Sequence, residues 1–151
     1  MGNSYNDLGL GNRIITRDYV AALAYYQEGE RVRRAIGDSA ALARMLPNLG
    51  RTYEAMGQYV KARDYYLQGA AFYLAVGDSA NWIVQRRNTA GLMTNYANRH
   101  SDALAILLDL QQDLRLIEDA RAEALVLLTM GVVRRRLGAY QGAIEASRTW
   151  L

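Results

Sequence analysis

The sequence predicts an all-α fold made of stacked helix pairs, and three observations favour it. Residues 19–40 return in large part as residues 59–80, and such a period is typical of repeats that bury their apolar faces against their neighbours. Within both copies, apolar and small residues fall at intervals of three and four, as they do along one face of a helix. No segment alternates apolar and polar residues for long, so no strand is predicted.

The ends of the predicted helices are marked by glycine and by residues that cap helices. Glycine readily adopts the left-handed conformation that ends a helix, and an aspartate side chain accepts a bond from the first amides of the next helix. Gly37-Asp38 and Gly77-Asp78 therefore separate repeats, and Glu118-Asp119 stands at the corresponding place further on. A second break inside each repeat is predicted at Arg17-Asp18, Gly57-Gln58, Asn98-Arg99 and Gly138-Ala139.

Each repeat is then two helices of about 15 to 18 residues joined by short turns. We predict a single helical repeat domain over residues 1–151. Its units are 3–37, 38–77, 78–118 and 119–151, and we expect the last one to be incomplete.

Small residues recur where the two helices of a pair should approach each other. Gly50, Gly91 and Gly131 occupy one equivalent site, and Ala22, Ala62, Ala103 and Ala143 occupy another. A glycine inside a helix costs roughly 1 kcal/mol relative to alanine, so three glycines at one site predict a close contact between helices. The repeat-equivalent tyrosines are predicted to be core residues: Tyr25, Tyr26, Tyr53, Tyr59, Tyr65 and Tyr66.

Pro47 is an anomaly, because it falls inside the first helix of the second repeat. A proline there removes a backbone donor and clashes with the preceding turn. We expect a kink near Met45 or a helix that restarts around Pro47.

Residues 49–62, which read LGRTYEAMGQYVKA, resemble the tetratricopeptide repeat pattern together with Tyr66. Gly131, Gly138, Tyr140 and Ala143 repeat its landmarks. The period of about 40 residues is similar to that of the long-helix variety of this family, found in kinesin light chains, spindle-orientation adaptors and bacterial regulators. The resemblance implies a right-handed α-solenoid whose first helices line a concave, peptide-binding groove.

The groove-facing positions that the resemblance implies hold amides and charges suited to a peptide. They are Arg44, Asn48, Arg51, Glu54, Gln85, Asn88, Asn95, Arg135 and Arg136. Asparagine amides can pair with an extended backbone, and arginines can fork onto carboxylates. The implied function is a non-catalytic protein–protein interaction module, part of a larger regulatory or scaffolding protein, with a protein or peptide ligand of acidic character. A solvated surface remains the competing interpretation of each residue.

Two other binding functions stay open. Arg134-Arg135-Arg136, Arg86-Arg87 and Arg33-Arg34 keep nucleic-acid binding as an alternative of less weight, because consecutive residues fan around a helix whereas phosphates need cations on one surface. Self-association is the other alternative, since Trp150 and Leu151 would leave an apolar C-terminal end through which homo-oligomers could form.

Catalysis is not predicted. His100-Ser101-Asp102 holds the residue types of a hydrolytic triad, but neighbours in one helix point about 100° apart and cannot converge. Asp109, Asp113 and Glu118 share a helical spacing that is more typical of a solvated face than of a metal site. Gly9-Leu10-Gly11 is only a fragment of a dinucleotide fingerprint, and we expect a loose helix or an entry turn there. We expect no cofactor and no metal.

The cellular setting follows from what the sequence lacks. No cysteine is present, so disulfide and thiolate chemistry are excluded. No apolar run approaches the about 18 residues that a membrane span requires, and residues 1–5 lack the features of a signal peptide. We expect a cytoplasmic protein without membrane contact.

Overall fold

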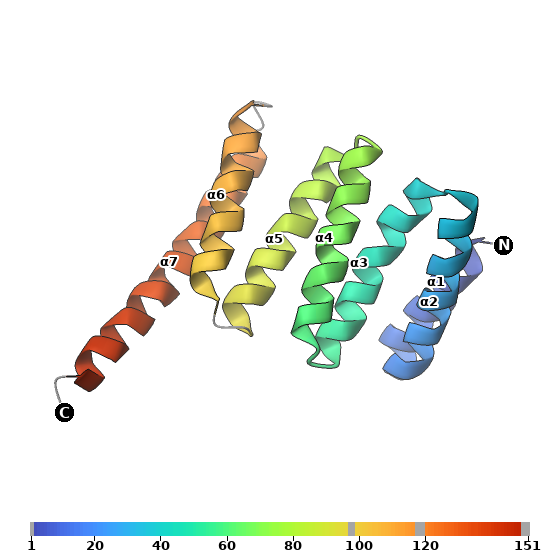
Figure 1. Ribbon diagram of the computed structural model, residues 1–151, viewed down its shortest axis with the longest axis horizontal. Coiled ribbons are helices and arrows are strands. Elements are labelled where there is room, and N and C mark those ends of the chain that lie inside the picture. The colour runs from blue at the N-terminus through green and yellow to red at the C-terminus, as the bar shows by residue number, and fades with distance from the viewer. Residues whose placement is uncertain (1, 97–98, 117–119, 149–151) are drawn as a thin grey trace. The chain divides into compact units, whose positions relative to one another are not determined.

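The computed structural model describes residues 2–96, 99–116 and 120–148, and all its regular elements there are helices (Figure 1). In chain order these are α1 (Gly2–Gly11), the π-helical turn η1 (Asn12–Thr16), α2 (Tyr19–Ile36), α3 (Ser39–Ala55), α4 (Tyr59–Ala75), α5 (Ser79–Asn95), α6 (His100–Leu116) and α7 (Ala120–Arg148). The prediction of an all-α fold of paired helices is confirmed.

The chain forms two compact parts, an N-terminal part (Met1–Gln85) and a C-terminal part (Arg86–Leu151). In the N-terminal part, α1 packs on α2, α2 packs on α3, and α3 packs on α4. In the C-terminal part, α6 packs on α7.

Three aspartates begin helices in the N-terminal part. Asp18 accepts a bond from the Ala21 amide at 2.9 Å, and Asp38 and Asp78 accept bonds from the amides three residues later at 3.0 Å. These bonds satisfy amides that have no partner inside the helix. The predicted starts of α2, α3 and α5 are therefore confirmed.

The turns before these helices also follow the prediction. Gly37, Gly57 and Gly77 have φ values of 71°, 73° and 77°, the left-handed conformation that glycine adopts without steric cost. The amide after each glycine bonds to a carbonyl of the preceding helix, as in Gln58 N to Tyr53 O at 2.9 Å. Arg17 takes the equivalent left-handed position before Asp18, with φ 54°.

In the core of the N-terminal part, two tyrosine rings pack directly against glycines of the neighbouring helix. A Cβ atom built at Gly50 would lie 2.8 Å from ring atoms of Tyr66 and 3.2 Å from the carbonyl oxygen of Ala62. A Cβ at Gly9 would lie 2.6 Å from the ring of Tyr26. Both tyrosines are buried, as predicted, so the two helices of each pair approach at the glycine.

Pro47 lies inside α3, which runs without interruption from Ser39 to Ala55. The predicted restart of the helix at Pro47 is therefore wrong. The proline is buried, and its ring fills the space above Gly69 of α4, where a Cβ atom would lie 2.9 Å from Pro47 Cγ and Cδ. Packing against a residue without a side chain offsets the cost of the missing hydrogen bond.

The predicted break at Gly138-Ala139 is wrong, because α7 continues through it as one helix of 29 residues. Gly138 is exposed, and no described atom lies within 4 Å of a Cβ built there. A continuous helix keeps its backbone hydrogen bonds, and the Tyr140 ring contacts the His100 ring edge-on with centroids 6.3 Å apart. The expected breaks at Asn98 and at Glu118-Asp119 fall on residues outside the described ranges.

The close contact predicted at Gly91 and Gly131 is also wrong. Apart from the neighbouring residues and the backbone of the same helix, no described atom lies within 4 Å of a Cβ built at either glycine, and Gly131 is exposed. At Gly91 the reason is the missing ring: Tyr66 stands four residues after Ala62, but the residue four after Ala103 is Leu107. At Gly131 the reason is that α7 continues to Arg148, so Ala143 lies on the same helix as the glycine. Repeat-equivalent glycines thus have different surroundings.

We predict opposite effects for the same substitution at two of these glycines. Gly50→Ala should destabilise the chain by about 1–3 kcal/mol, because the new methyl group overlaps the Tyr66 ring. Gly131→Ala should stabilise it by about 0.5–1 kcal/mol, because the site has space and alanine favours helix. Urea denaturation followed by circular dichroism measures both. Equal effects of the two substitutions would contradict the packing described here.

We also predict acid sensitivity from the capping aspartates. The bond from the Ala41 amide lowers the pKa of Asp38, and the Asn81 side chain and amide lower the pKa of Asp78. A carboxylate whose pKa is lowered by folding stabilises the protein above the unfolded pKa of about 4, and this contribution is lost as the pH falls through the folded pKa. The free energy of unfolding should therefore fall between pH 5 and pH 2.

The Asp38→Asn/Asp78→Asn variant is the control for this pH effect. Asparagine still caps a helix through its carbonyl oxygen but does not titrate. The variant should lose less stability over the same pH range in thermal melts. An unchanged pH dependence would show that these two caps contribute nothing to it.

Candidate functional site

The nine predicted site residues come from α3, α5 and α7 and fall in both compact parts. Arg44, Asn48, Arg51 and Glu54 lie on α3 in the N-terminal part, and we call them the α3 surface. Asn88, Asn95, Arg135 and Arg136 belong to the C-terminal part. Gln85, the last residue of the N-terminal part, is only 3% exposed, so it differs from the groove-facing position expected for it.

Asn48 is held at the centre of the α3 surface. Its Nδ2 donates to Asn6 Oδ1 of α1 at 2.9 Å, and its Oδ1 accepts a bond from Arg51 Nη1 at 3.4 Å. The amide therefore links α1 to α3 and positions the Arg51 guanidinium. Asn6 was not among the predicted residues, because nothing in its local sequence indicates a partner 42 residues away.

The Glu54 carboxylate is hydrogen-bonded to a tyrosine of the core. The Tyr66 hydroxyl donates to Glu54 Oε2 at 2.6 Å. Burial raises the pKa of Tyr66, and the Glu54 carboxylate raises it further, so this tyrosine stays protonated and keeps donating. Glu54 thus fixes the position of the ring that lies over Gly50.

Arg13 of η1 is a second residue that the sequence did not indicate. Its guanidinium lies near the hydroxyls of Tyr26 and Tyr66 and opposes the rise that burial causes in both pKa values. The Tyr26 hydroxyl and Arg13 Nε are both buried, and neither has a hydrogen-bond partner among the described residues. With Arg51, which acts on the same two tyrosines, Arg13 makes this region positively charged.

Arg44 and Arg51 differ from most other arginines of the N-terminal part. Arg31, Arg33, Arg34 and Arg63 all pair with a carboxylate of the chain, at 2.5 to 2.8 Å. Arg44 and Arg51 are exposed, and no described carboxylate lies within 4.0 Å of either. Their charges remain available to a carboxylate of another molecule.

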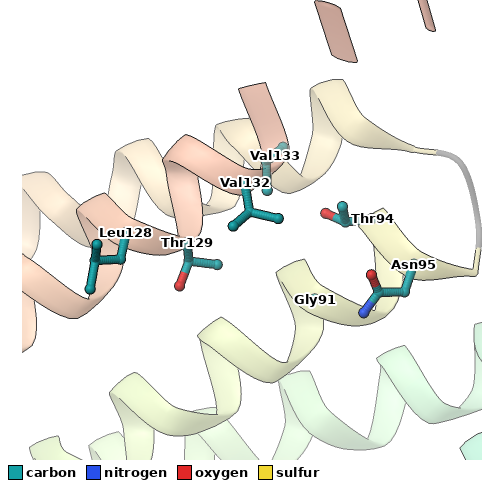
Figure 2. A pocket seen from close by; sticks show the side chains of 7 residues that line it. All are labelled: Gly91, Thr94, Asn95, Leu128, Thr129, Val132 and Val133. Carbon is teal, nitrogen blue, oxygen red and sulfur yellow. The ribbon is translucent and has the colours of Figure 1, made fainter. Parts of the chain in front are cut away.

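The C-terminal part contains a pocket between α5 and α7 with a volume of about 260 Å³. We call it the α5–α7 pocket. Figure 2 shows Gly91, Thr94 and Asn95 on the α5 side and Leu128, Thr129, Val132 and Val133 on the α7 side. Of the predicted residues, only Asn95 lines it.

Arg136 joins Asn95 at this pocket. Arg136 Nη1 donates to Asn95 Oδ1 at 2.5 Å, so two predicted residues separated by 41 positions are in contact. Thr94 and Thr129 donate their hydroxyl hydrogens to carbonyls one turn earlier, at 2.8 and 2.9 Å. Each threonine can therefore contact a ligand only with its hydroxyl oxygen, as an acceptor, and with its methyl group. Arg135 is exposed, and Asn88 is half-buried.

Four of the residues weighed for catalysis or metal binding are engaged in structural contacts, and Glu118 lies outside the described residues. His100 is buried against Tyr140, and Asp102 pairs with Arg99 at 2.5 Å. Arg86 lies 3.5 Å from Asp113 and 4.0 Å from Asp109. In the described ranges, no group of three histidine, cysteine or acidic residues is placed to hold a metal ion.

The described helices include none that is both long and apolar enough to span a membrane. Trp150 and Leu151, which motivated the hypothesis of association through the C-terminal end, lie outside the described residues.

The comparisons with known proteins agree with the repeat pattern. Residues 1–75, about half of the chain, match the family model described as Tetratricopeptide repeat. A search of curated proteins gives no match. The matched segment contains the first two helix pairs, with the two glycine–tyrosine contacts and the capped starts of α2 and α3. The chain therefore belongs to the tetratricopeptide repeat family, whose repeats form protein–protein interaction modules.

Proposed function

We propose that this chain binds an acidic peptide segment of a partner protein, in part through the α3 surface. One observation carries the proposal. Arg44 and Arg51 have no carboxylate partner among the described residues, whereas four other arginines of the N-terminal part are ion-paired. Charge-assisted hydrogen bonds to an arginine are stronger than neutral ones, and a carboxylate can accept two of them side by side.

Three features of the α3 surface support this proposal. Asn6 and Asn48 hold Arg51 in place, which lowers the entropy that binding would cost. The nearby charge of Arg13 has the same sign, and Glu54, the one acidic residue of the surface, is already bonded to Tyr66. The surface thus presents positive charge from a rigid helix.

The Arg44→Ala/Arg51→Ala variant tests the proposal. Peptides should be selected from a random phage-displayed library on the wild-type chain and then synthesised. We expect them to be rich in aspartate and glutamate, to bind less tightly as salt is raised, and to bind the variant at least about tenfold less tightly. Fluorescence polarisation with labelled peptides measures the dissociation constants.

The matched control is Arg31→Ala/Arg63→Ala. It removes the same charge from the N-terminal part, but both arginines are paired within the chain. This control should keep the wild-type affinity, and both variants should keep the wild-type melting temperature within a few degrees. Selected peptides that bind all three proteins equally would refute binding at the α3 surface.

A further inference from the structure

The first two repeats place a tyrosine ring over a glycine, and the third does not. Tyr26 lies over Gly9, and Tyr66 lies over Gly50. Each tyrosine follows a fully buried alanine, Ala22 or Ala62, by four residues. In the third repeat the corresponding alanine, Ala103, is also fully buried, but Leu107 stands where the tyrosine would be.

Leucine is shorter than tyrosine and carries no ring that could reach across the glycine. A Cβ atom built at Gly91 accordingly meets no described atom within 4 Å, whereas the equivalent Cβ atoms at Gly9 and Gly50 would overlap a ring. The α5–α7 pocket is lined by Gly91 and therefore lies beside the glycine that has lost its ring.

Three residues near Tyr26 correspond to three of the seven residues that line this pocket. Tyr26 packs on Gly9 and lies near Arg13 of the same first helix region and Arg51 of the next first helix. In the repeat register that aligns Gly9, Gly50, Gly91 and Gly131, these three positions correspond to Gly91, Asn95 and Val132. All three line the α5–α7 pocket (Figure 2).

We propose that the α5–α7 pocket binds a tyrosine side chain of the partner protein, which occupies the place of the ring that the third repeat lacks. This inference deepens the proposed function and rests on it. The volume of about 260 Å³ lies below the range of about 300–1,000 Å³ that is usual for drug-sized ligands, so the pocket suits a single side chain.

The polar groups of the pocket fit a phenol. Because Arg136 donates to Asn95 Oδ1, the Asn95 Nδ2 group can donate to the phenol oxygen. Because the Thr94 and Thr129 hydroxyls donate to carbonyls of their own helices, their oxygens can accept the phenol proton. Leu128, Val132 and Val133 supply the apolar wall for the ring.

The charge beside the pocket indicates what flanks the tyrosine. Arg136 is exposed and donates to Asn95, which lines the pocket. No described carboxylate lies within 4.0 Å of the Arg136 guanidinium. Carboxylates on either side of the tyrosine would complement this charge.

Binding of p-cresol, the side chain of tyrosine as a free molecule, tests the pocket directly. In the nitrogen-15-labelled full chain, p-cresol should cause saturable shifts of the amide signals of Gly91, Thr94, Asn95 and Thr129. Toluene, which lacks the hydroxyl, should bind more weakly. Shifts that map away from these residues would overturn the proposal.

Two variants fill the pocket from within. Leu107→Tyr restores the ring of the first two repeats, and Gly91→Leu places a side chain where a Cβ atom has space, so the second variant should fold even if the first does not. Each folded variant should bind p-cresol at least tenfold less tightly than the wild type. Unchanged binding to Gly91→Leu would overturn the proposal.

A pair of peptides separates this inference from the proposed function. An acetylated pentapeptide with tyrosine between two pairs of aspartates should bind the wild type at least tenfold more tightly than the same peptide with alanine, and Gly91→Leu should abolish the difference. If the two peptides bind equally while library peptides still require Arg44 and Arg51, the tyrosine site is wrong and the acidic-peptide function stands. If the tyrosine peptide binds as expected and Arg44→Ala/Arg51→Ala has no effect on library peptides, only the α3 surface is refuted.

Discussion

The contact between a tyrosine ring of a second helix and a glycine of a first helix is the interaction on which this structure depends. Gly9 and Gly50 let the rings of Tyr26 and Tyr66 lie across the helix backbone, which brings the paired helices together and buries two large side chains. A contact in the reverse direction occurs where Pro47 of the first helix α3 fills the space over Gly69 of the second helix α4. Glycine weakens a helix, but here the packing it allows offsets that cost.

This contact also connects the core with the candidate binding surface. The Tyr66 hydroxyl donates to Glu54 of the α3 surface, and the Tyr26 hydroxyl lies near Arg13, so the buried rings carry their hydroxyls to polar residues outside the core. Where Leu107 replaces the ring, the chain instead has a pocket lined by Gly91 and Asn95. In our proposal, this one position of the repeat distinguishes a closed core from a pocket that binds a partner side chain.

Local signals made most of the fold predictable. The left-handed glycines and capping aspartates act within a few residues, so Gly37-Asp38, Gly57 and Gly77-Asp78 could be read directly. Contacts between residues far apart in the sequence could not be predicted in this way. The surroundings of Gly91 depend on Leu107, and the continuity of α7 through Gly138 is not indicated by the residues next to that glycine. For the same reason, Asn95 and Arg136 were predicted as site residues but their hydrogen bond to each other was not, and the roles of Asn6 and Arg13 were not predicted at all.

Nuclear Overhauser contacts in the free, isotopically labelled chain test the central interaction most directly. The ring protons of Tyr26 and Tyr66 should show strong contacts to the α-protons of Gly9 and Gly50, and the α-protons of Gly91 should show no contact to an aromatic ring. Absence of the first two contacts, or an aromatic contact at Gly91, would contradict the account of how these repeats pack and of why the third one has a pocket.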